Sequence, residues 1–150
     1  MKYLGIDPGV SGGVAIIKGS STISSYKCPK TTQEMADLII KISDKNTIAI
    51  IEKVHSFPGQ GVVSTFTFGS NYGQWLGILS ALRIEYELIT PRTWQKKYQP
   101  LSKVKKDRKN ALKNLAKSSF PKENVTLYTA DAILLALYLK EEGKNAINKL

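Results

Sequence analysis

The sequence predicts an α/β domain, and three features carry this prediction. Apolar strands are expected at residues 2–6 and 13–18, on either side of a sharp turn built around Pro8-Gly9. Residues 47–52 hold four consecutive apolar residues, which is typical of a strand that is covered on both faces. An amphipathic helix is expected between these strands, so the chain alternates strand and helix as α/β domains do.

The helix that precedes residues 47–52 has a clear start signal. Thr31 and Glu34 have the spacing of a capping box, with Thr31 as the N-cap. The apolar residues that follow recur at i, i+3, i+4 and i+7 and so share one helix face: Met35, Leu38, Ile39 and Ile42. Residues 22–27, before this helix, form a more polar strand that is expected at an edge of the sheet.

The second half of the chain is expected to continue the pattern. Residues 53–70 are predicted to form a long loop, residues 72–82 a helix and residues 84–90 a strand. The helical spacing of Trp75 and Leu79 favours a place in the core. The last helix is expected to begin after Thr129 as N-cap, and it is apolar nearly all round, which predicts that it is buried.

Composition limits the class of protein. The chain has 150 residues and is expected to form one domain, residues 1–150, with 42% hydrophobic and 23% charged residues. Its net charge of +10 predicts a polyanionic partner, nucleic acid first and an acidic membrane surface second. A lone cysteine, Cys28, excludes a disulfide framework and a cysteine zinc site.

No secretion signal or membrane span is expected, because Asp7 interrupts the first apolar stretch and the longest apolar run, residues 132–139, is too short. A cytoplasmic protein without a membrane partner is therefore predicted.

Two predicted strands end in an acid. Asp7 ends the first strand and Glu52 ends the strand at residues 47–52. If these strands are parallel neighbours, their carboxyl ends are level and about 5 Å apart, which places both acids at one rim of the sheet. Carboxylates so close repel each other unless a divalent cation lies between them. The alternative for Asp7 is that it caps its own turn.

Asp131 lies in the first turn of the buried last helix. It is either an acid that the helix dipole stabilises or a third ligand held over the same rim.

Residues 92–117 hold ten basic residues and one acid, Asp107, which is a candidate N-cap for a helix there. A solvated face is the ordinary interpretation of lysines, but the one-sided charge favours a surface that binds phosphates. The candidate DNA-binding residues in this stretch are Arg92, Lys96, Lys97, Lys103, Lys105, Lys106, Arg108 and Lys109.

Several motifs together resemble RuvC-type Holliday-junction resolvases, within the ribonuclease-H-like superfamily. They are Asp7-Pro8-Gly9 with Gly12-Gly13, Glu52 at the end of an apolar strand, and Ala130-Asp131-Ala132 at the start of an apolar helix. Residues 52–55, 68–73, 91–94 and 105–107 resemble the phage and phage-related branch. The resemblance implies a ribonuclease-H-like fold, in which a mixed five-stranded sheet carries helices on both faces.

The resemblance also implies an activity. It makes Asp7, Glu52 and Asp131 the catalytic ligands of two Mg²⁺ ions, with Asp7 as the bridge and Mn²⁺ as a substitute. The implied enzyme is a structure-selective endodeoxyribonuclease that nicks four-way DNA junctions in pairs, leaving a 5′-phosphate and a 3′-hydroxyl. It works as a homodimer, for which residues 72–82 are the candidate interface, in a bacterial cell or a phage-infected host.

One position departs from the family pattern. Three residues before its last aspartate the family has an acid or a histidine, and this chain has Tyr128. Water, Asp107 or Glu123 would then complete the coordination, or activity would be impaired. His55 lies where the family stacks an aromatic residue on a base, and Phe57 is a second candidate for this contact. The ordinary alternative is a surface loop histidine.

Three other functions remain open. An ATP-binding fold of the actin and sugar-kinase class also opens with strand, aspartate and glycine-rich turn, but it needs two such domains. A ribonuclease-H-like nuclease that acts on structured RNA or flapped DNA would use the same metals. A non-catalytic junction-binding module would fit the missing fourth ligand.

Overall fold

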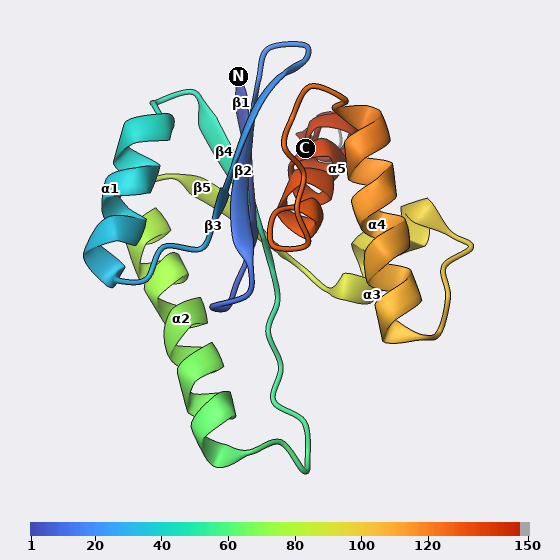
Figure 1. Ribbon diagram of the computed structural model, residues 1–150. Helices are drawn as coiled ribbons and strands as arrows, with labels where there is room; N and C mark the ends of the chain where they lie inside the picture. Colours follow the sequence, from blue (N-terminus) through green and yellow to red (C-terminus); the bar gives the residue numbers. More distant parts are fainter. Residues whose placement is uncertain (148–150) are drawn as a thin grey trace.

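A five-stranded mixed sheet forms the centre of the molecule, and helices cover both of its faces (Figure 1). The computed structural model describes the backbone of residues 1–147 and the side chains of residues 1–143. The strand order is β3-β2-β1-β4-β5. The strands are β1 (Lys2–Asp7), β2 (Gly13–Lys18), β3 (Thr22–Lys27), β4 (Thr47–Glu52) and β5 (Glu85–Ile89). This confirms the predicted mixed sheet and places β3 at an edge.

The register of the two central strands brings their acidic ends together. Strands β1 and β4 are parallel, and Ile6 lies opposite Ile51. Asp7 and Glu52 each follow one residue later, so the two strands end side by side at the same rim of the sheet. β2 and β3 run antiparallel to β1 and β2 respectively, because tight turns join them.

The helices form one layer on each face of the sheet (Figure 1). They are α1 (Thr32–Ile42), α2 (Val62–Ala81), α3 (Pro91–Gln95), α4 (Lys105–Ser119) and α5 (Ala130–Ile147), with a 3₁₀ turn, η1 (Lys96–Tyr98). Helices α1 and α2 share one apolar cluster with the sheet, and α4 and α5 share the other. None of the helices in residues 1–147 combines the length and the apolar character that crossing a bilayer requires.

Helix α5 lies directly on β1. A Cβ atom added at Gly5 would collide with the backbone oxygen of Ala132 and the backbone nitrogen of Ala136. Only glycine permits so close an approach of helix and strand. This contact fixes the first turn of α5, which carries Asp131, above the end of β1.

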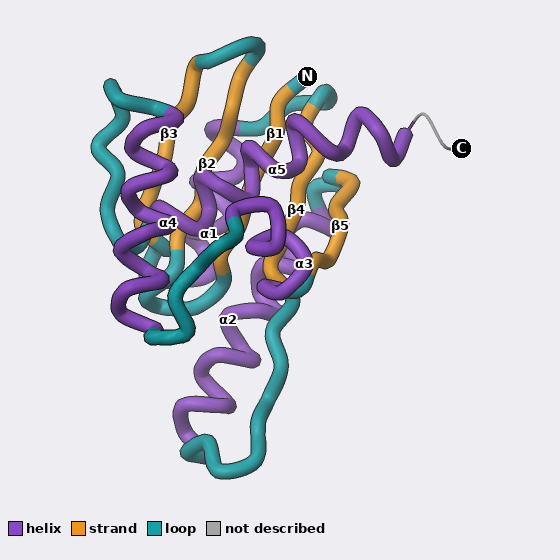
Figure 2. The backbone as a smooth tube through the Cα atoms, turned by 90° about the vertical axis from the view of Figure 1, so that its right-hand side faces the viewer, coloured by secondary structure: helices purple, strands orange, loops and turns teal. Residues whose placement is uncertain are grey.

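Helix α2 begins earlier than the sequence predicts. Residues 62–70 were expected to be loop, but α2 starts at Val62 and the loop covers only residues 53–61. The reason is that Val62, Val63 and Phe66 are 85%, 79% and 76% exposed, so this part of the helix has no buried face for a periodic pattern to reveal. Its later part carries Trp75 and Leu79, both fully buried as predicted. The early turns project beyond the sheet (Figure 2).

Helix starts are only partly as predicted. The capping box of α1 is present, with the Glu34 backbone N–H donating to Thr31 at 3.2 Å. Asp107 is not an N-cap, because α4 begins two residues earlier behind Val104 and no side chain caps it. Thr129 lies directly before α5, and its hydroxyl oxygen accepts the backbone N–H of Thr126 at 3.0 Å.

Candidate active site

The three candidate acids come from three different elements and meet at one rim of the sheet. Asp7 ends β1, Glu52 ends β4 and Asp131 opens α5. Asp131 is only 4% exposed, and Asp7 and Glu52 are half-buried. The parallel register and the close approach of α5 to β1 therefore bring together the acids that the sequence singled out.

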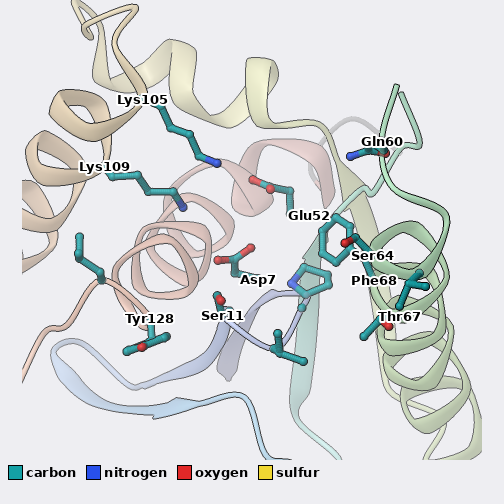
Figure 3. Close-up of a pocket in the computed structure, with 16 residues that line it drawn as sticks. Asp7, Ser11, Glu52, Gln60, Ser64, Thr67, Phe68, Lys105, Lys109 and Tyr128 are labelled. Atoms are coloured by element: carbon teal, nitrogen blue, oxygen red, sulfur yellow. The ribbon is translucent and has the colours of Figure 1, made fainter. Parts of the chain in front are cut away.

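A cleft of about 960 Å³ opens over this rim (Figure 3). Asp7, Glu52 and the turn at residues 8–12 form its floor. Helix α4 contributes Lys105 and Lys109 to one wall, and residues 60–68 form the opposite wall. In Figure 3 the two ammonium groups point toward the acids. The cleft thus has an acidic floor, a basic wall and a wall without formal charge.

Lys109 makes the closest contact in the site. Its Nζ lies 2.5 Å from Oδ2 of Asp131, a buried carboxylate. The other carboxylate oxygen of Asp131, Oδ1, is buried without a hydrogen-bond partner. A buried carboxylate oxygen without a donor is unfavourable, and this one is free to accept a cation or a proton donor.

Trp94 holds the second acid. Its indole Nε1–H donates to Oε2 of Glu52 at 2.7 Å, and the ring is fully buried against α4 and α5. The hydrogen bond leaves the remaining oxygen of Glu52 for the cleft. No local sequence signal predicts this contact, because it joins residues 42 positions apart.

Burial and repulsion between carboxylates raise the pKa values of Asp7 and Glu52. Burial raises the pKa of Asp7 well above its usual value, and Asp131 and Glu52 raise it further, against a smaller effect of Lys109. Burial likewise raises the pKa of Glu52 from 4.5 to about 7, although the Trp94 hydrogen bond lowers it. Burial alone would lower the pKa of Lys109, but Asp131, Asp7 and Glu52 together raise it. This is an acidic cluster short of positive charge.

The raised pKa of Glu52 predicts how the metal-free protein responds to pH. A carboxyl whose pKa is higher in the folded than in the unfolded state favours folding below the unfolded value, and this advantage is lost as the pH rises through the folded value. Chemical denaturation in chelator should therefore show that stability falls between pH 4.5 and about 7. Glu52→Gln should make that fall shallower, and an equally steep fall in the variant would contradict the prediction.

The donor set fits divalent cations. Carboxylate oxygens are the ligands that Mg²⁺ prefers, and one of them, Oδ1 of Asp131, has no partner. Within the side chains that the structure describes, no group of three or more acidic, histidine or cysteine residues surrounds a single point. In this arrangement one oxygen of Asp131 accepts a hydrogen bond from Lys109, and one oxygen of Glu52 accepts a hydrogen bond from Trp94.

The residues considered for a fourth ligand lie in different places. Tyr128 lines the cleft, with the ammonium of Lys27 4.0 Å from its ring centre. Glu123 accepts hydrogen bonds from the backbone and hydroxyl of Ser25 on β3, at 3.0 and 2.5 Å. Asp107 lies in the first turn of α4 and does not line the cleft. Neither Asp107 nor Glu123, the two side chains considered as a further ligand, lines the cleft.

The candidate DNA-binding residues separate into groups. Lys105 and Lys109 line the cleft. Lys97 pairs with Glu141 and, at 2.9 Å, with Glu142, so α5 partly neutralises it. Arg108 donates to the backbone oxygens of Ser102 and Lys103, both at 3.2 Å. The others are exposed outside the cleft: Arg92, Lys96, Lys103, Lys106, His55 and Phe57.

A scan against models of protein families finds no match, and a search of curated proteins finds none either. Among solved structures, the chain is similar to Thermus thermophilus RuvC in complex with a Holliday junction substrate, with a TM-score of 0.67 and 11% identity over 97% of this chain and 96% of that chain. A second T. thermophilus RuvC structure matches with a TM-score of 0.63 and 12% identity over 97% of both chains. The likeness confirms the predicted ribonuclease-H-like fold.

Proposed function

We propose that this protein is a metal-dependent endonuclease that cuts four-way DNA junctions by paired nicks. The observation that carries the proposal is a cleft with Asp7 and Glu52 on its floor and Lys109 on its wall, where Lys109 pairs with the buried Asp131. A similar fold in T. thermophilus RuvC is found in complex with a Holliday junction substrate, which supports the choice of DNA. A strongly basic chain with an acidic cluster in a cleft fits phosphodiester hydrolysis.

Asp7, Glu52 and Asp131 would hold two Mg²⁺ ions, or Mn²⁺ in their place. Such ions would supply activation of a water and neutralisation of charge on the leaving 3′ oxygen, and the expected products are a 5′-phosphate and a 3′-hydroxyl. Trp94 keeps Glu52 directed at the cleft through its indole N–H. Lys105 and Lys109 attract the phosphate backbone to the wall above the acids.

The uncharged segment beside the cleft favours branched DNA over regular duplex. There is no Asp, Glu, Lys or Arg between residues 54 and 82. Instead this projecting part exposes Phe57 and Phe66 at 64% and 76%. Exposed aromatic rings stack on bases, and bases are available only where a duplex is interrupted. His55 lies in the same loop and would contribute to this contact.

Binding should depend steeply on salt. If the exposed lysines of α4 and of the segment before it neutralise phosphates, removing one lysine should reduce the slope of log affinity against log salt concentration by about 1. Lys103→Ala and Lys106→Ala are expected to do so. Lys97→Ala should change the slope less, because Glu141 and Glu142 already pair with Lys97. Fluorescence anisotropy with a labelled junction checks this, and a salt-independent affinity would contradict it.

A homodimer would present two such clefts to the two symmetric strands of a junction. The exposed face of α2 is the candidate interface. At Gly73 and Gly77 an added Cβ would meet nothing within 4 Å in the described part of the chain, so another backbone can approach there. We expect light scattering to report a dimer at micromolar concentration. A monomer, with and without junction DNA, would contradict the prediction.

The other candidate is a nuclease of the same fold that acts on structured RNA or flapped DNA. Incubation of the protein with a labelled four-way junction, a flapped duplex, a matched duplex and an RNA–DNA hybrid, in Mg²⁺ or chelator, separates the two. Symmetric nicks confined to the junction in Mg²⁺ support the proposal. Preferential cutting of the flap or the hybrid supports the other nuclease, and junction binding without nicks indicates a non-catalytic module.

A further inference from the structure

Asn71 is a buried polar residue of α2 that contacts the turn after Asp7. The backbone N–H of Gly9 donates to its Oδ1 at 2.7 Å. Its own Nδ2 donates to Sγ of Cys28 at 3.4 Å. The side chain is only 8% exposed, so both contacts are made out of water, where a hydrogen bond is strong and its loss unfavourable. Asn71 thus joins α2, the end of β3 and the turn that follows β1.

The turn itself is held from several sides. The Gly12 N–H donates to the Gly9 oxygen at 2.9 Å, and the Cys28 N–H donates to the Gly12 oxygen at 3.0 Å. Gly9 has φ of +110°, a conformation that favours glycine, and an added Cβ would lie 2.8 Å from the ring of Phe68. Two residues of α2 therefore contact Gly9: the ring of Phe68 packs against it, and the side chain of Asn71 accepts its N–H.

Asp7 and Gly9 are separated only by Pro8, whose ring fixes its φ. A displacement of Gly9 therefore passes along a stiff link to the backbone of Asp7. We propose that Asn71 is a positioning residue of the candidate active site, which sets the place of Asp7 through Gly9. The inference rests on the proposed function, because it gives Asp7 a catalytic task.

The chemistry of an amide suits this position. Asn71 offers an acceptor to Gly9 and a donor to Cys28 without adding a charge next to three acids that already repel one another. A carboxylate in its place would accept from Gly9 equally well but would increase the repulsion. Burial raises the pKa of the Cys28 thiol, which keeps this partner neutral as well.

Helix α2 also connects this contact to the projecting tip. Its early turns expose Val62, Val63 and Phe66, whereas its later turns are anchored in the core by Trp75 and Leu79. Asn71 lies between these two parts along the helix. Helix α2 therefore connects the surface proposed to contact bases with the turn that follows Asp7.

The test compares Asn71→Leu, which keeps the branched heavy-atom skeleton and loses both hydrogen bonds, with Cys28→Ala, which leaves the bond to Gly9 in place. Asn114→Ala, an exposed asparagine of α4, is the matched control. Junction cutting is measured at saturating protein across a Mg²⁺ titration, and Mn²⁺ affinity is measured separately by calorimetry without DNA. We expect Asn71→Leu to weaken Mn²⁺ binding and raise the Mg²⁺ midpoint by about 10- to 100-fold, with junction affinity changed less than about twofold. Cys28→Ala and Asn114→Ala should stay within about twofold of the wild type on both readouts.

A purely structural role would lower the melting temperature and leave both metal readouts unchanged in the folded fraction, which would overturn the inference. If Asn71→Leu does not fold, the same two metal readouts are taken on Asn71→Ser. The wild type gives an independent test by NMR: the Gly9 N–H should be protected from exchange, and its chemical shift should change when Mg²⁺ is added. A Gly9 N–H that is unprotected, or whose chemical shift does not respond to Mg²⁺, contradicts the inference. A wild type that binds Mn²⁺ but cuts no junction would refute the proposed function alone, because the Mn²⁺ affinities still test Asn71.

Discussion

Asp7→Asn is expected to abolish Mg²⁺-dependent nicking of a four-way junction, by about three orders of magnitude or more. Asp7 lies on the floor of the cleft beside Glu52 and is a proposed ligand of the metal ions. Metal ions contribute several kcal/mol to stabilising the transition state of phosphodiester hydrolysis, and each 1.36 kcal/mol is tenfold in rate. Single-turnover cutting with end-labelled junction measures the loss. Glu52→Gln and Asp131→Asn should behave alike.

The same substitution should stabilise the metal-free protein. Burial and the neighbouring acids raise the pKa of Asp7 well above its usual value, so its charged form opposes folding at neutral pH. An asparagine of nearly equal shape removes that charge. We expect a higher melting temperature for Asp7→Asn in chelator and unchanged junction binding. Lost binding together with a lower melting temperature would mean that Asp7 is structural, as in the turn-capping interpretation.

Lys109→Met is expected to destabilise the metal-free protein by about 2 kcal/mol. The substitution removes the cation that lies 2.5 Å from Asp131, whose other oxygen already has no partner. Breaking a fully buried ion pair costs about 3–5 kcal/mol, and the smaller figure applies because the Lys109 side chain is 40% exposed. Urea denaturation at low salt, in chelator, measures the difference.

Mg²⁺ should restore part of the stability that Lys109→Met loses, because a divalent cation can then neutralise Asp131. The rise in melting temperature on adding Mg²⁺ should be larger in the variant than in the wild type. Lys105→Met is the matched control: it lies one turn earlier in α4, lines the same cleft and makes no contact with Asp131. Equal stability losses for the two variants would contradict a specific role of Lys109.

The strands and their acidic ends could be predicted from the sequence. Apolar runs that stop abruptly at Asp7 and Glu52 are local signals, whereas the parallel pairing of the two strands is a condition that only the structure establishes. The structure confirms that the two strand ends lie side by side. Asp131 could be placed as well, because a helix that is apolar nearly all round must lie on the sheet.

The contacts around these acids could not be predicted. Lys109 was one of ten basic residues in its stretch, and only the packing of α4 against α5 sets it on Asp131. Trp94 reaches Glu52, and Asn71 reaches Gly9, across 42 and 62 residues. The start of α2 was missed for the opposite reason, since its early turns contact nothing in the core and leave no apolar period. Apolar periodicity in the sequence indicates which residues are buried. The contacts of Lys109, Trp94 and Asn71 could not be predicted from it, because they join residues that are far apart in the sequence.

Anomalous diffraction from crystals soaked in MnCl₂ tests most directly whether Asp7, Glu52 and Asp131 form a metal site. We predict anomalous density in the cleft among the three carboxylates, with the Lys109 ammonium moved away from Oδ2 of Asp131. Density at other places only, with Lys109 still on Asp131 and the carboxylates unchanged, would contradict the account.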